Sequence, residues 1–92
     1  MPEMILEERT EKPTMAEHRE ALDAALREQF PGGLMRSQWE GDILQLSGPG
    51  AHGTITLEGD RLVGKAELSP PASLMRGLVE EKIKAVLKKA VV

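Results

Sequence analysis

The chain has 92 residues, of which 12 are Lys or Arg and 15 are Asp or Glu, and its formal net charge is −3. This length is enough for one domain, residues 1–92, and too short for two. The absence of cysteine excludes a disulfide framework and a thiolate zinc site, and an acidic chain with one Trp and one Phe argues against a nucleic-acid-binding domain.

The first eight residues include three Glu and only three consecutive apolar residues. A secretory signal needs a basic start and a longer apolar stretch, and a membrane-spanning helix needs about 20 apolar residues. We therefore expect a soluble, cytoplasmic protein with no integral membrane insertion.

The N-terminal third predicts a short extended segment followed by a helix. Residues 4–8 are expected to form an edge strand, paired within the chain or with a second chain, or a frayed arm. Thr14 and Glu17 have the spacing of a capping box, which marks a helix start. One face of this helix then carries side chains at spacings of three and four: Met15, His18, Leu22, Ala25, Leu26 and Phe30. Residues 31–33, Pro-Gly-Gly, end the helix.

From Met35 to Leu68 the apolar period changes to two, which is typical of strands with one buried and one wet face. Glu-Gly-Asp occurs twice, at residues 40–42 and 58–60. Gly-Asp suits a two-residue hairpin loop whose first position needs a positive φ. The sequence therefore predicts two consecutive hairpins. Between them, residues 48–53 contain three Gly and one Pro, which predicts a mobile connector.

A long helix is expected after Ser69, with Pro71 or Ala72 in its first turn. It carries a wide apolar stripe: Leu74, Met75, Leu78, Val79, Ile83, Val86, Leu87 and Ala90. Residues 69–92 have a net charge of +3, whereas residues 1–68 have −6. Lysines at the end of a helix complement its dipole, which accounts for this asymmetry without an anionic partner.

These elements predict an α+β fold in which an antiparallel sheet of four to five strands is covered on one face by two helices. The expected order is β-α-β-β-β-β-α. One layer of helices on one layer of sheet buries both apolar stripes and the apolar face of the strands.

Nothing in the sequence predicts catalysis, a metal site or a cofactor. His18 and His52 lie in different elements, so converging metal ligands are not expected. Asp42 and Asp60 are explained as turn residues, and no serine has a base near it in the sequence. We therefore expect a protein that is not an enzyme.

Two regions are candidates for binding. The last helix combines apolar residues with lysines, as an interfacial helix does, although a core helix with a solvated basic edge is the simpler interpretation. The candidate partner surface on this helix consists of Met75, Val79, Lys82, Val86, Lys89 and Ala90. A candidate apolar pocket, between a curved sheet and this helix, is lined by Trp39, Leu46 and Leu57.

The order and spacing of several motifs resemble the putative polyhydroxyalkanoic acid system family, small bacterial proteins linked with polyhydroxyalkanoate metabolism and granules. The motifs are Trp39-Glu40-Gly41-Asp42-Ile43-Leu44, residues 50–55, Gly59-Asp60-Arg61-Leu62, the pair Glu67-Leu68, and the last helix with Ile83 and Leu87. The sequence departs from the family at residues 69–73, where a more apolar lead into the helix is expected.

This resemblance implies a non-enzymatic accessory protein in the cytoplasm or at storage granules, whose partner is a granule surface or a granule protein. A homodimer is a further alternative. The alternative function is a small carrier that holds an acyl or hydroxyacyl ligand in the apolar pocket.

Overall fold

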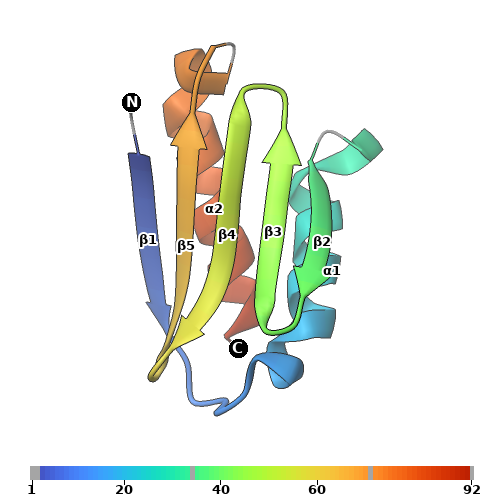
Figure 1. Ribbon diagram of the computed structural model, residues 1–92, viewed down its shortest axis with the longest axis vertical. Helices are drawn as coiled ribbons and strands as arrows, with labels where there is room; N and C mark the ends of the chain where they lie inside the picture. The colour runs from blue at the N-terminus through green and yellow to red at the C-terminus, as the bar shows by residue number, and fades with distance from the viewer. Residues whose placement is uncertain (1–2, 34, 71, 92) are drawn as a thin grey trace.

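The computed structural model describes residues 3–33, 35–70 and 72–91. A five-stranded antiparallel sheet in the order β1-β5-β4-β3-β2 carries both helices on one face (Figure 1). The elements are β1 (Glu3–Arg9), the 3₁₀-helix η1 (Met15–His18), α1 (Arg19–Gln29), η2 (Pro31–Gly33), β2 (Arg36–Glu40), β3 (Ile43–Gly48), β4 (Ala51–Glu58), β5 (Arg61–Leu68), η3 (Ala72–Met75) and α2 (Arg76–Ala90). The predicted α+β class and element order are confirmed; Pro71, a predicted first-turn residue, lies outside the described residues.

The first segment forms a strand within the chain. β1 pairs antiparallel with β5, with Leu6 opposite Gly64, so the N-terminal strand is the edge strand on this side of the sheet. At the start of η1, the backbone N–H of Thr14 donates to Glu17 Oε2 at 3.3 Å, which confirms the capping box.

The two Glu-Gly-Asp turns have the backbone that the sequence predicts. Gly41 has a φ of 60° and Gly59 a φ of 64°, whereas no described non-glycine residue has a positive φ. A positive φ at only the first loop position is the pattern of a type II′ turn, whose twist matches that of the flanking strands. Glycine is needed at these two positions because a side chain there would be strained.

The prediction of a mobile connector at residues 48–53 is wrong. β3 and β4 stay paired as far as Gly48 opposite Ala51, so only Pro49 and Gly50 form the turn. Proline followed by a glycine with a φ of 73° fits a tight turn. The Ser69 N–H also donates to the Gly50 carbonyl at 2.7 Å. The glycines that suggested mobility therefore serve a third hairpin and a paired strand.

The core lies between the sheet and the two helices. Alternate residues of the strands point into it, and the largest of its fully buried apolar side chains are Leu22, Leu44, Ile55, Leu62, Leu68, Val86 and Leu87. Opposite α2 the sheet presents Gly64, where an added Cβ would contact Ile83 and Leu87 at 3.5 Å. The missing side chain therefore lets α2 lie close to β5.

Lysine side chains donate hydrogen bonds to backbone carbonyls at the C-termini of both helices. Lys82 of α2 donates to the Gln29 carbonyl at 2.8 Å, and Lys12 donates to the Ala90 carbonyl at 3.2 Å. Because a helix C-terminus carries unpaired carbonyls and partial negative charge, both contacts are favourable. They fix the two helices to each other and to the segment after β1.

The close packing of β4 against β5 at Gly53 can be tested by mutation. A Cβ at Gly53 would lie 2.5 Å from the Lys65 carbonyl oxygen, so Gly53→Ala must shift the β4–β5 backbone. We expect it to lower the free energy of unfolding by about 1–3 kcal/mol in urea denaturation. The matched control is Gly77→Ala in α2, where an added Cβ meets nothing within 4 Å. This change should raise stability by about 0.5–1 kcal/mol, and equal effects of the two changes would contradict the packing argument.

Candidate functional site

The predicted partner surface on α2 is not a single exposed face. Val86 and Ala90 are each 0% exposed, so their assignment to a surface is wrong. They lie in the core cluster with Ile83 and Leu87. The apolar stripe at this end of α2 is therefore buried against the sheet and α1. Val79 is half-buried and packs against the same cluster.

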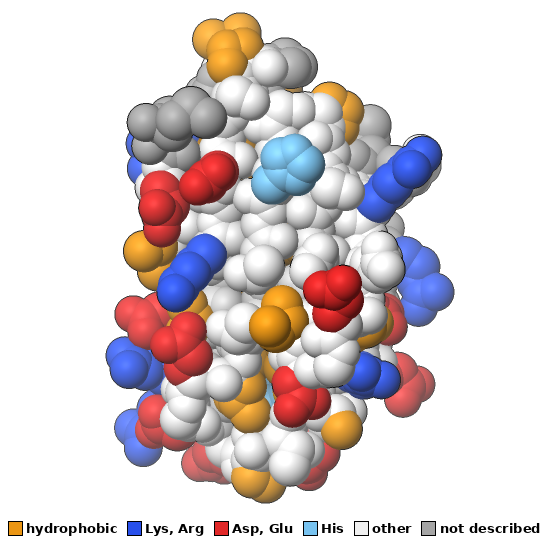
Figure 2. Space-filling model, viewed as in Figure 1, with side chains coloured by type: hydrophobic (Ala, Val, Ile, Leu, Met, Phe, Trp, Pro, Cys, Tyr) orange, Lys and Arg blue, Asp and Glu red, His pale blue; other side chains and the backbone are white. Residues whose placement is uncertain are grey.

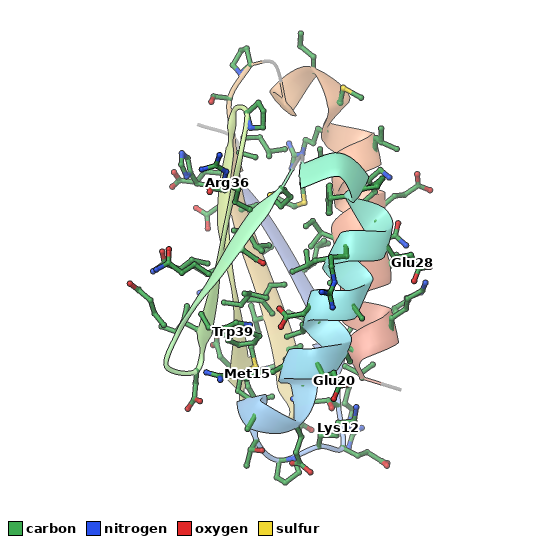
Figure 3. All side chains as sticks on the ribbon, turned by 90° about the vertical axis from the view of Figure 1, so that its right-hand side faces the viewer. Lys12, Met15, Glu20, Glu28, Arg36 and Trp39 are labelled. Carbon is green, nitrogen blue, oxygen red and sulfur yellow. The ribbon has the colours of Figure 1, made fainter. Side chains whose placement is uncertain are left out.

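The two lysines of the predicted surface contact α1. Lys82 is half-buried, donates to the Gln29 carbonyl and lies 5.7 Å from the centroid of the Phe30 ring. Lys89 forms an exposed ion pair with Glu28 (labelled in Figure 3). Lys82 in particular has a structural role at the end of α1, which the sequence did not reveal because the two residues are 53 positions apart.

Met75, by contrast, belongs to a group of exposed apolar side chains that we call the apolar cluster: Leu74, Met75 and Leu78. Their exposed fractions are 82%, 54% and 44%. They lie on η3 and the first turn of α2, at the end of the molecule beyond the tip of β5 (Figure 1). Contiguous exposed apolar patches mark interaction sites on soluble proteins, so this group is a candidate binding surface.

The predicted apolar pocket does not form around Trp39. Its indole N–H donates to Asp23 Oδ1 at 3.1 Å, and the Arg19 guanidinium lies 4.7 Å from the ring centroid. Figure 3 shows Trp39 pointing from β2 toward α1. It therefore anchors an edge strand to a helix. Leu57 packs against the core cluster as a partly buried side chain.

Leu46, the third predicted pocket residue, lines a small apolar cavity between the sheet and α2. The cavity has a volume of about 10 Å³, and its lining includes Val79 and Ile83 but neither Trp39 nor Leu57. This is room for about one water molecule. An acyl group does not fit in it.

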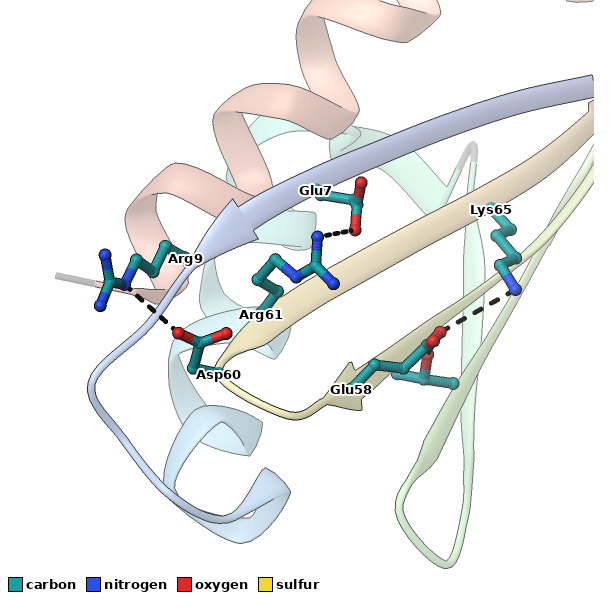
Figure 4. Close-up of polar contacts among 7 residues, drawn as sticks. Glu7, Arg9, Glu58, Asp60, Arg61 and Lys65 are labelled. Atoms are coloured by element: carbon teal, nitrogen blue, oxygen red, sulfur yellow. Dashed lines mark hydrogen bonds and ion pairs between the residues drawn. The ribbon is translucent and has the colours of Figure 1, made fainter.

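The face of the sheet away from the helices is open and polar (Figure 2). A hollow of about 750 Å³ crosses it, lined by side chains from all five strands, among them Arg36, Gln45, His52, Lys65 and Glu67. Ion pairs between Lys65 and Glu58 at 3.9 Å and between Arg61 and Glu7 at 3.0 Å lie on this face (Figure 4). Both pairs are exposed, so each contributes little to stability.

One row across this face contains a hydroxyl, an imidazole and a carboxylate. His52 is paired in register with Ser47 on one side and with Glu67 on the other. These are the residue types of a nucleophile, a base and an orienting acid, and only strand register reveals that they are neighbours. Catalysis by such a group requires hydrogen bonds along the row and an oxyanion hole in a site closed to water. The open hollow does not exclude water.

His18 is a buried, fully paired residue. Its Nδ1 lies 2.8 Å from the Thr14 carbonyl and its Nε2 lies 2.8 Å from Thr10 Oγ1. Because a carbonyl only accepts hydrogen bonds, Nδ1 donates to it, and in a neutral imidazole Nε2 then accepts from the Thr10 hydroxyl. His18 is therefore a core residue whose two ring nitrogens are both paired, and the two bonds join the segment after β1 to the first helix.

Within residues 3–33, 35–70 and 72–91, no three His, Cys, Asp or Glu side chains are grouped so as to hold a metal ion. None of the helices in this part of the chain is long and apolar enough to span a membrane.

Comparison with known proteins identifies one family. The family model described as "Putative polyhydroxyalkanoic acid system protein" matches residues 9–91. No curated protein and no solved structure matches the chain. The match covers both helices and four of the five strands, together with the last residue of β1.

The Thr10–His18 contact can be tested by Thr10→Val, which keeps the shape of the side chain and removes the hydroxyl. His18 Nε2 then lacks its partner in a buried site, so we expect the free energy of unfolding to fall by about 1–3 kcal/mol. Thr54→Val, on the open face of the sheet, is the matched control and should change stability by less than about 0.5 kcal/mol. Urea denaturation measures both, and an unchanged Thr10→Val midpoint would remove the structural role assigned to this contact.

Proposed function

The chain belongs to the putative polyhydroxyalkanoic acid system protein family, and from this membership we propose that it is a non-enzymatic accessory protein of bacterial polyhydroxyalkanoate metabolism. It binds the hydrophobic surface of a storage granule, or a protein on that surface, through the apolar cluster of Leu74, Met75 and Leu78. Its place is the cytoplasm and the granule surface.

The exposure of the apolar cluster is the observation that carries this proposal. Leu74 is 82% exposed although leucine is among the most frequently buried residue types. Fully burying one such side chain is worth about 1.5–3 kcal/mol. Three neighbouring apolar side chains that together leave water would therefore provide enough free energy for reversible adsorption to an apolar surface.

The position of the cluster also supports the proposal. It lies at one end of the molecule, at the start of α2, while the other half of α2 is buried against the sheet and α1. A surface can therefore cover the cluster without disturbing the core. Of the surface predicted from the sequence, this binding surface keeps Met75 at the start of the helix and leaves out the buried Val86 and Ala90 at its lysine-rich end.

The carrier alternative receives no support from the interior. The cavity of about 10 Å³ between the sheet and α2 cannot hold an acyl chain, and Trp39 is engaged by Asp23 and Arg19. Opening a larger cavity would require separating α2 from β5, which would expose Ile83 and Leu87 to water.

Granule binding is tested by sedimentation of the purified protein with amorphous poly(3-hydroxybutyrate) particles. Leu74→Asp/Leu78→Asp removes two apolar side chains from the cluster and adds charge, so we expect the bound fraction at equal protein concentration to fall about tenfold or more. Acidic residues near the start of a helix are favourable, so the fold should be retained.

The matched control is Ile43→Asp. Ile43 is 41% exposed on the open sheet face, away from the apolar cluster, and its replacement should leave binding unchanged. Binding to protein-coated granules but not to bare polymer particles would identify a granule protein as the partner. A wild-type protein that stays in the supernatant in both cases would contradict the proposal.

The absence of enzymatic activity is tested with a soluble ester, p-nitrophenyl butyrate, because Ser47, His52 and Glu67 lie in one row on the open face of the sheet. We expect the purified protein to release nitrophenol at the same rate as its His52→Ala variant and a protein of similar size without esterase activity. A faster rate that His52→Ala removes would show an enzyme.

A further inference from the structure

β1 has a free edge. It pairs with β5 on one side, and on the other side no described element lies beside it (Figure 1). The strand is seven residues long, and Ile5 on its outer face is 55% exposed. A strand edge of this length with an exposed apolar residue is a template for pairing with another strand.

The register identifies the backbone groups that are free. Thr10, which continues the β1–β5 register, donates its N–H to the Asp60 carbonyl at 2.8 Å. Hydrogen-bonded and non-hydrogen-bonded pairs alternate along an antiparallel ladder. The even-numbered residues of β1 therefore bond to β5. The odd-numbered ones direct their N–H and C=O groups to the free edge: Glu3, Ile5, Glu7 and Arg9.

We propose that a second copy of this chain pairs on this edge, its β1 running antiparallel about a two-fold axis at Leu6, so that the two sheets become continuous. Opposite residues of an antiparallel pair share a face, and the odd-numbered residues must exchange the new hydrogen bonds. If at least five residues of each β1 are paired as well, three central residues remain for a symmetric pairing: Ile5, Leu6 and Glu7.

The charges of the opposed residues favour a two-fold axis at Leu6 over one at Ile5 or Glu7. An axis at Ile5 places Glu3 opposite the partner's Glu7. An axis at Glu7 places Glu7 opposite the partner's Glu7. Both arrangements oppose like charges, which is destabilising. Centring on Leu6 places Glu3 opposite the partner's Arg9, twice by symmetry. This is the register in which the directly opposed charges are of opposite sign.

Apolar contacts agree with the same register. On the helix side, the half-buried Leu6 meets the partner's Leu6 in a non-hydrogen-bonded pair, the type in which side chains are closest. On the open side, the exposed Ile5 is the diagonal neighbour of the partner's Ile5, within reach of a long side chain. Pairing therefore reduces the exposure of both isoleucines to water.

The opposite edge of the sheet, β2, is the competing site. It has five residues, and its hairpin closes at Glu40 opposite Ile43, so by alternation only Ser37 and Trp39 direct backbone groups outward. β1 offers twice as many residues for pairing, and its central residues are apolar. The longer edge is therefore the one we assign to the second copy.

Cysteine cross-linking tests the pairing directly, because the natural chain contains no cysteine. Leu6→Cys places two thiols opposite each other at a Cβ separation of about 4.5–5.5 Å, close to that of a disulfide. Gln38→Cys is the matched variant for a β2 dimer centred on Gln38. Under mild oxidation we expect Leu6→Cys to give mainly covalent dimer and Gln38→Cys to remain monomeric. The reverse result, or no dimer with either variant, overturns the proposal.

Charge exchange provides a second test that leaves the core unchanged. By sedimentation equilibrium the wild-type protein should be a dimer, and Glu3→Arg should raise its Kd about tenfold, because two attractive pairs become repulsive. The double variant Glu3→Arg/Arg9→Glu restores opposite charges and should return the Kd to within about twofold of the wild-type value. A wild-type monomer at all concentrations, or a double variant that dimerises more weakly than Glu3→Arg, overturns the proposal.

Discussion

The burial of one face of the β2–β5 hairpins under α1 and α2 is the constraint on which the other features of this molecule depend. Because side chains alternate along a strand, one apolar face and one polar face are fixed together, and a slip of one residue would exchange them. The apolar face of the sheet packs against Ile83, Val86 and Leu87 of α2. What remains for binding is whatever this core does not use: the start of α2, the open sheet face and the free edges.

Local backbone requirements made much of the fold predictable. Gly41 and Gly59 mark hairpins because a positive φ at the first loop position is strained for any other residue. Thr14 and Glu17 mark a helix start because their groups satisfy each other. The same logic fails at residues 48–53, where the glycine content predicts a mobile connector and the structure has a tight turn between paired strands. Gly53 is instead required by the close approach of the Lys65 carbonyl, a long-range contact that composition does not reveal.

The candidate site was harder to predict because helical periodicity gives the direction of a side chain and not the extent of the surface that covers it. Leu74 and Leu78 belong to the same apolar stripe as Ile83 and Leu87, yet only the latter pair lies over the sheet. In the sequence, Val86 and Ala90 look like part of a surface beside lysines, but both are buried, and Lys82 and Lys89 contact α1. Likewise, only the strand register places Ser47, His52 and Glu67 in one row.

The two proposed surfaces are compatible with each other for a geometric reason. η3 follows the end of β5 that pairs with the start of β1, so the apolar cluster lies at the Glu3 end of the free edge. Pairing about a two-fold axis at Leu6 reverses the second copy. It leaves the helices of both copies on the same side of the continuous sheet and places their clusters at opposite ends of the dimer. Neither cluster is then covered by the partner, and one dimer can contact two separate apolar surfaces.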